Sequence, residues 1–375
     1  MQMQDPGYLR PHQSGALERD QEQQIAAVCP GLGQEVEAAG RQDDDLWGPY
    51  VSMHTGHATD PDLRFTGSSG GGISALLVYL LDQGLVEGVV QTGADPGVPV
   101  GNMAVLSQTA KDVKTAAGSR YAPSSPLAGL AAHVDSGKRL AFVGKPCDVA
   151  ALRALTLQDE KIRQAFPYML SFFCAGVPSQ TGAKAVLRAL GTDQGRTQDF
   201  RYRGNGWPGQ ATATDKDGST HSMSYHDSWG KILSKHVQHR CKICADGTGV
   251  AADVVCADAW EVDERGYPLF QERDGISLIV GRTMLGEELI AAATKTGSIA
   301  TAPFDVAGLA KMQPGQTGRR QALWARLAGL KLMGKSTPHY RGLHIRAAAR
   351  RNPVKVNLKN FLGMVRRVLQ GRIGS

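Results

Sequence analysis

Two cysteines separated by two residues, Cys241 and Cys244 in HRCKICADG, place the strongest constraint on how this chain can fold. Such a pair brings two thiolates to one side of a tight turn, close enough to bind the same metal ion or iron–sulfur cluster. Either kind of site needs further ligands, which must come from distant parts of the sequence. The chain has four other cysteines, Cys29, Cys147, Cys174 and Cys256.

Size and composition limit the class of protein. The chain has 375 residues, enough for two packed units with a core that needs no disulfide bonds. Its residues are 42% hydrophobic, but no apolar run approaches the ~20 residues that cross a bilayer. The first residues are polar and contain no secretory apolar stretch. We therefore predict a cytoplasmic protein, in which cysteines act as ligands or catalysts.

Apolar strand patterns alternate with helical patterns from Leu46 onward. LAFVG and YMLSFF are typical of buried strands, and KPCDVAALRAL and QTGAKAVLRALG are typical of helices. This alternation predicts an α/β fold with a helix-covered mixed sheet, built as two packed subdomains. We expect a poorly defined segment at 1–45, subdomains at 46–135 and 136–305, and a basic helical tail at 306–375.

Two cysteines are placed to complete the site of the C-x-x-C pair. Cys147 lies between a predicted strand and a predicted helix, whose N-terminus favours a thiolate. Cys174 follows the next strand, and open α/β sheets bind ligands at the carboxyl ends of their strands. With Cys241 and Cys244 they supply the four thiolates that a [4Fe–4S] cluster requires.

Other assignments of the cysteines remain open. Cys147 and Cys174 could be buried thiols without a ligand role. Cys256, in ADVVCADAW, is the rival fourth ligand, although its apolar neighbours fit a strand interior. His236 and His239 could form a zinc site with the C-x-x-C pair. Outside this set, Cys29 lacks the earlier cysteines of a ferredoxin run, and we predict that it is inert.

Two segments are candidates for binding a nucleotide cofactor. SSGGGIS precedes a predicted helix, and its small residues leave backbone N–H groups free for an anion such as a flavin dinucleotide pyrophosphate, although a simple helix cap has the same pattern. AAGSRY offers an arginine for phosphate and a tyrosine for stacking, although a surface loop has the same pattern. The candidate residues are Ser68, Ser69, Gly70, Gly71, Gly72, Gly118, Ser119, Arg120 and Tyr121.

The C-terminal tail differs in charge from the rest of the chain. Residues 306–375 contain 15 Lys or Arg and no Asp or Glu, which leaves 27 basic and 35 acidic residues elsewhere. Such a tail could dock an acidic partner, an anionic surface or nucleic acid, or remain solvated. Its second helical stretch, LKNFLGMVRRVL, could lie on a membrane surface, but we prefer packing on the body with the arginines outward.

In their order along the chain, five segments resemble the beta-subunit family of the deazaflavin (coenzyme factor 420) hydrogenase and formate dehydrogenase. This family includes 7-hydroxymethyl chlorophyll a reductase. The resemblance spans roughly Trp47 to Gly315. The segments are SSGGGISALLVYLLDQGLVEGVV, AAGSRY, GKPCDVAALR, FFCAG and CKICADGTGVAADVVCADAW.

The resemblance implies an FAD and a [4Fe–4S] cluster held side by side. The family's cluster ligands match Cys147, Cys174, Cys241 and Cys244, and its flavin-contacting segments match 68–72 and 118–121. Subdomain 46–135 would then contact the flavin, and 136–305 would hold the cluster and flavin. Lys145, Lys242 and Asp246 flank these ligands and are candidates for tuning the cluster, although a surface charge is the simpler interpretation of each. Lys145 is also a candidate for contacting a cofactor.

The function that the resemblance implies is that of an oxidoreductase. Single electrons would pass between the cluster and FAD, and a hydride between FAD and a small molecule, which the family suggests is a deazaflavin. One alternative is a reductase of a tetrapyrrole or other conjugated substrate. Another is an electron-transfer adaptor subunit without catalytic activity. A redox protein or ferredoxin is the expected partner; a zinc-bound nucleic-acid module is a further hypothesis that we do not favour.

Overall fold

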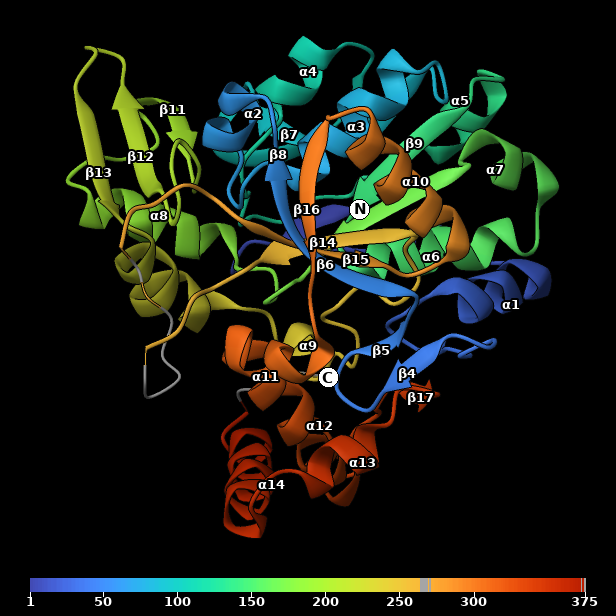
Figure 1. The fold of residues 1–375 in the computed structure, drawn as a ribbon. Coiled ribbons are helices and arrows are strands. Elements are labelled where there is room, and N and C mark those ends of the chain that lie inside the picture. Colours follow the sequence, from blue (N-terminus) through green and yellow to red (C-terminus); the bar gives the residue numbers. More distant parts are fainter. Residues whose placement is uncertain (264–268, 270, 372, 374–375) are drawn as a thin grey trace.

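The computed structural model describes residues 1–263, 269, 271–371 and 373. In this part of the chain an eight-stranded mixed sheet lies at the centre (Figure 1), in the order β16-β6-β15-β14-β10-β9-β7-β8. The strands are β6 (Ser52–Ala58), β7 (Gly88–Asp95), β8 (Val98–Ser107), β9 (Leu140–Gly144), β10 (Tyr168–Phe172), β14 (Val254–Asp258), β15 (Ser277–Gly281) and β16 (Ile299–Pro303).

The four strands β7, β9, β10 and β14 form the parallel part of the sheet. β8 folds back on β7 in antiparallel orientation, and β15, β6 and β16 extend the opposite side through antiparallel pairs. Parallel neighbours point their carboxyl ends to the same edge, so the segments after β9, β10 and β14 meet there.

Side chains alternate between two cores, one on each face of the sheet. In β9, Leu140 and Phe142 enter one core, whereas Ala141 and Val143 enter the other. One face is covered by α5 (Leu130–Asp135), α6 (Pro146–Thr156) and α7 (Glu160–Ala165). The other is covered by α3 (Gly72–Asp82), α4 (Ala110–Thr115) and α10 (Met284–Lys295). The predicted helix-covered α/β sheet is confirmed.

A smaller sheet flanks the central one and has its own core. It contains β11 (Thr197–Arg201), β12 (Gln210–Asp215) and β13 (Thr220–Ser224), packed against α8 (Gln180–Ala189). A π-helix, η1 (His226–Ile232), and a 3-10 helix, η2 (Leu233–His236), lead from β13 to α9 (His239–Lys242), the short helix that carries Cys241.

The basic tail packs on the body. α12 (Pro314–Leu332) contacts α13 (Ile345–Arg350) and α14 (Val354–Leu369), and their apolar side chains share a core with residues around the C-x-x-C pair. In α14, Met364 is buried and Arg366 and Arg367 are exposed, as we predicted for this helix. Before α12 come η3 (Val306–Gly308) and α11 (Leu309–Met312).

The N-terminal segment has more structure than its sequence suggests. Residues 33–35 (β3) pair in parallel with 339–341 (β17), and the Tyr8 hydroxyl donates to the carbonyl oxygen of His236 at 2.6 Å. The remaining elements are β1 (Gln2–Gln4), β2 (Tyr8–Arg10), α1 (Arg19–Val28), β3 (Gly33–Glu35), β4 (Gln42–Asp44), β5 (Gly48–Tyr50), α2 (Pro61–Thr66) and β17 (His339–Arg341). Among the described residues, no helix combines the length and apolar character needed to cross a bilayer.

Candidate functional site

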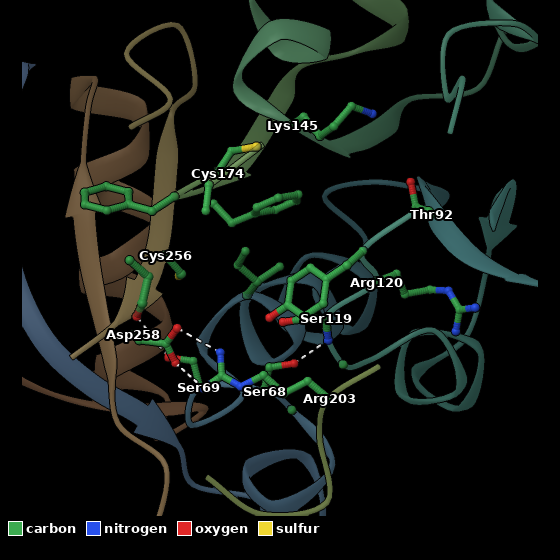
Figure 2. Close-up of a pocket in the computed structure, with 18 of the residues that line it drawn as sticks. Ser68, Ser69, Thr92, Ser119, Arg120, Lys145, Cys174, Arg203, Cys256 and Asp258 are labelled. Carbon is green, nitrogen blue, oxygen red and sulfur yellow. Dashed lines mark hydrogen bonds and ion pairs between the residues drawn. The ribbon is translucent and has the colours of Figure 1, made fainter. Parts of the chain in front are cut away.

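A cavity of about 300 Å³ opens at the carboxyl-end edge of the parallel strands. Its volume is at the lower end of the range of ligand pockets. Figure 2 shows Lys145 and Cys174 at one end of it and Ser68, Ser119 and Arg203 at the other. The predicted cofactor residues that line it are Ser68, Ser69, Gly71, Gly72, Gly118, Ser119, Arg120, Tyr121 and Lys145.

The small-residue loop before α3 has the features of an anion site. Gly71, with φ of +69°, is the N-cap of α3 and has no side chain to cap the helix. The Gly72 N–H donates to Ser277 Oγ at 3.4 Å. A Cβ at Gly72 would lie 2.9 Å from Ser277 Oγ, so only glycine fits where the loop meets β15. Gly70, in contrast, packs against the backbone of Gly275 and does not line the cavity.

The second predicted segment is anchored by β8, a strand that we did not predict. Arg120 donates through Nε to Asn102 Oδ1 at 2.6 Å and through Nη2 to the Gly101 carbonyl at 2.9 Å. Burial lowers the pKa of the Arg120 guanidinium. Ser119 donates its N–H to Ser68 Oγ, which ties the two predicted segments together. The Tyr121 ring packs against Trp229 with 4.8 Å between ring centroids.

An aromatic and ionic cluster that sequence reasoning missed forms another wall. Arg203 makes two hydrogen bonds to the Asp258 carboxylate, at 2.9 and 2.7 Å, and Trp207 Nε1 donates to the same carboxylate at 2.8 Å. The guanidinium lies over the rings of Tyr225 and Trp260, at 4.4 and 5.2 Å from their centroids. Burial alone would lower the pKa of Arg203, but the charge and hydrogen bonds of Asp258, together with Tyr121 and Tyr225, outweigh burial and raise it.

A second, smaller cavity of about 150 Å³ is lined by all four predicted cluster ligands, Cys147, Cys174, Cys241 and Cys244. Burial raises the pKa of Cys147 well above its usual range, that of Cys174 to about 11 and that of Cys244 to about 12. Neighbouring thiols add to each of these shifts. All four thiols line this one small cavity, so negative charges on them would repel one another.

The other cysteines and the histidines lie elsewhere. Cys256 is 5% exposed in β14 on the face covered by α3, and it lines the larger cavity but not the smaller one. Cys29 is half-buried at the C-cap of α1 and lines neither cavity. His236 and His239 also do not line the cysteine cavity. Among the described residues, no group of three or more His, Cys, Asp or Glu has the spacing for a single metal ion.

Backbone donors and the tail shape the cysteine cavity. The N–H groups of Gly176 and Val177 donate to Cys174 Sγ and Cys241 Sγ, each at 3.4 Å. From α12, Gln316 donates to the Cys174 carbonyl at 3.0 Å and Arg319 to the Cys241 carbonyl at 2.9 Å. The tail therefore holds the backbone at two of the four predicted ligands.

The three predicted tuning residues differ in their surroundings. Lys145 Nζ pairs with Asp148 Oδ2 at 2.6 Å and Ser124 Oγ at 3.0 Å, and the lysine lines both cavities. The Asp246 carboxylate accepts from the N–H groups that follow it and holds the turn after Cys244. Lys242 is largely exposed, but partial burial and the nearby Arg367 and Arg326 lower its pKa.

Comparison with known proteins identifies the group to which this architecture belongs. Models of the N-terminal and C-terminal parts of the coenzyme F420 hydrogenase/dehydrogenase beta subunit match residues 53–131 and 137–307. The chain belongs to this family. The coenzyme F420 hydrogenase beta subunit of Methanothermobacter thermautotrophicus is 23% identical over 302 residues, which are 78% of this chain and 99% of the relative.

Further relatives carry other activities on the same family framework. The F420-dependent formate dehydrogenase 1 beta subunit of Methanococcus maripaludis is 26% identical over 68% of this chain and 63% of its own length. The F420-dependent sulfite reductase of Methanocaldococcus jannaschii is 27% identical over 60% of this chain and 34% of its own length. A chain of the F420-reducing [NiFe] hydrogenase complex from Methanosarcina barkeri shares the fold, with a TM-score of 0.61 and 20% identity over 79% of this chain and 98% of that chain.

Proposed function

We propose that this member of the family is an oxidoreductase that binds FAD and a [4Fe–4S] cluster and exchanges a hydride with a deazaflavin. The observation that carries the proposal is a shared wall. Ser124, Lys145, Cys174, Gly176 and Val177 line both the larger cavity and the cysteine cavity. Groups bound in the two cavities would be neighbours, as electron transfer between them requires.

The residues of the larger cavity fit a flavin dinucleotide. The uncapped first turn of α3 offers N–H donors to a pyrophosphate, and Gly71 and Gly72 let an anion approach the backbone. Tyr121, Tyr225 and Trp260 give the cavity aromatic surface for a flat ring system. When bound, FAD supplies both single-electron and hydride chemistry.

The residues of the smaller cavity fit an iron–sulfur cube. Ionising the buried thiols of Cys147, Cys174 and Cys244 is unfavourable without cations, and iron supplies the positive charge that compensates them. A single ion draws every ligand atom into one coordination sphere. In a four-iron cube each cysteine binds a different iron, so the sulfurs can lie farther apart than a single-ion site allows.

Within this arrangement the chain's own residues set position and electrostatics. Lys145, held by Asp148, places a positive charge in the wall between the cavities. The N–H groups of Gly176 and Val177 would hydrogen-bond to ligand sulfurs, which raises the potential of a cluster. The deazaflavin assignment is supported by the coenzyme named for the relatives.

The proposal is tested on the full chain purified without oxygen. We expect a brown protein with four irons per chain that releases FAD on denaturation. It should reduce a one-electron dye at the expense of reduced deazaflavin. A colourless protein without flavin would contradict the cofactor assignment. A protein that contains both groups but does not react with deazaflavin would contradict the substrate and favour an electron-transfer adaptor.

A further inference from the structure

The last helix, α14, carries an apolar stripe that no part of the described chain covers. Residues spaced three or four apart lie on one face of a helix. The side chains of Val354, Leu358, Leu362 and Leu369 are 84%, 54%, 54% and 72% exposed, and Val365 lies in the same row. The stripe runs along the whole helix, which is about 24 Å long at 1.5 Å per residue.

The packing of α14 against α12 keeps this stripe exposed. Its opposite side rests on α12, where Met364 is 1% exposed and a Cβ on Gly329 would lie 3.1 Å from Met364 Cβ. Asn360 accepts a hydrogen bond from Arg326 Nε at 3.1 Å. These contacts fix the rotation of α14 about its axis, so the stripe faces solvent. Figure 1 shows α14 at the lower end of the molecule, away from the central sheet.

A row of cations lies beside the stripe. Lys355, Lys359 and Arg366 are exposed, and each follows a stripe residue by one position. One position corresponds to about 100° around the helix, so the row runs parallel to the stripe. Residues 306–375 contain no acidic residue that could neutralise these charges.

From this pattern we propose that α14 lies flat on an anionic lipid surface, with its valines and leucines inserted and its cations at the headgroups. A helix of this kind gains affinity from both the buried apolar area and the attraction to anionic lipids. Protein interfaces, in contrast, concentrate aromatic residues and arginine and exclude lysine from their centres. Phe361 lies at the same spacing but is half-buried, and the exposed members of the stripe are all aliphatic. Exposed aliphatic side chains beside lysines favour lipid over an acidic protein partner.

The test uses the full chain and sedimentation with vesicles. Wild-type protein should bind vesicles of equal parts phosphatidylglycerol and phosphatidylcholine at low salt. It should bind pure phosphatidylcholine far more weakly, and lose most of its binding to the anionic vesicles at high salt. Replacing Lys355, Lys359 and Arg366 with Gln should weaken binding on the order of a hundredfold, since each cation contributes about fivefold.

The apolar stripe is tested separately. Leu358→Gln with Leu362→Gln should weaken binding roughly tenfold or more, because both side chains lose their favourable transfer from water. Leu157→Gln and Lys161→Gln serve as matched controls, because both positions are exposed on the body of the protein. They should bind as wild type does. All variants change exposed side chains, and an unchanged thermal unfolding midpoint verifies that they fold.

Three results would overturn the proposal. One is a wild-type protein that ignores anionic vesicles at low salt. Another is unaltered binding by the Leu358→Gln, Leu362→Gln variant, which would reduce the interaction to charge alone. The third is a protein that is retained on a polyglutamate resin but does not bind vesicles. That result would indicate that the tail binds an acidic protein. None of these measurements depends on flavin, iron or catalytic activity.

Discussion

Single residues with similar sequence surroundings reach different environments in this fold. Cys174 and Cys256 both belong to apolar segments near the ends of neighbouring parallel strands. Cys174 lies two residues beyond β10, in the wall of the cysteine cavity, whereas Cys256 lies inside β14 and packs toward α3. The position of the cysteine relative to the strand end, and not the apolar character of the segment, therefore distinguishes a proposed ligand from a core thiol.

Replacing Cys244 tests the proposed ligand set directly. Cys244→Ser should lose most of the iron and keep much of the flavin, because the α3 loop and the cysteine cavity are built from different segments. Iron and flavin are measured per chain after anaerobic purification. Cys29→Ser, which lies outside both cavities, is the control and should keep both groups. Full iron content in Cys244→Ser would remove it from the ligand set.

Asp258→Asn tests the buried ion pair in the wall of the larger cavity. The change leaves the 2% exposed Arg203 side chain without its anionic partner, and breaking a buried pair costs about 3 kcal/mol. Urea unfolding gives the difference in free energy. Glu160→Gln removes the exposed partner of Arg163 and should leave stability nearly unchanged, because solvent screens an exposed ion pair. Equal effects of the two changes would contradict the role given to Asp258.

At the scale of elements, α12 has a role that its sequence does not reveal. Its apolar spacing and basic character predicted a helix, but Arg320 is only 4% exposed. This guanidinium donates to the carbonyls of Ala245, just after Cys244, and of Leu343 at the start of the chain segment leading to α13. A long basic helix thus provides internal donors for the cysteine turn.

Arg320→Met should therefore disturb the cysteine turn from a distance. Buried carbonyls that lose their donors destabilise the fold by about 1–3 kcal/mol. Without these hydrogen bonds the turn after Cys244 should move more freely, so the protein should also lose iron to a chelator faster. Lys331→Met, an exposed position on the same helix, is the control. An Arg320→Met protein that is less stable but releases iron at the wild-type rate would show that the bracing is not transmitted to the cysteines.

The elements that could be predicted from the sequence have their pattern in a short stretch of neighbouring residues. The features that were missed do not. β9 and α6 were predictable because a fully apolar run and a helical period adjoin at Gly144 to Pro146. β8 was missed since it is an edge strand, half exposed and interrupted by Pro99 and Gly101. The pair of Arg203 and Asp258 was also missed, because its members are 55 positions apart and neither belongs to a local motif.

At the scale of the whole molecule, buried thiols link stability to pH. Burial raises the pKa of Cys256 to about 12, above its value in an unfolded chain. A group with a raised folded pKa stabilises the protein fully below the unfolded pKa of ~8.5. This contribution is lost as pH rises toward the folded pKa, because the unfolded chain ionises first.

Comparing wild type with Cys256→Ala isolates this contribution. Between pH 9 and pH 10 the metal-free wild type should lose about 1 kcal/mol more unfolding free energy than the variant, since one thiol contributes about 1.4 kcal/mol per pH unit in this window. Urea titrations of both proteins at the two pH values give the difference. Equal losses of unfolding free energy in the two proteins would show that the Cys256 thiol is no more protonated in the folded state than in the unfolded chain.

The bracing of the cysteine turn by α12 also sets an order of events during biosynthesis. Cys241 and Cys244 leave the ribosome well before Arg319 and Arg320, which donate to the carbonyls of Cys241 and of Ala245. A nascent chain that has just exposed its thiols still lacks the helix that fixes them. The proposed cluster would therefore enter a finished pocket only after α12 has been made and has packed behind the cysteines.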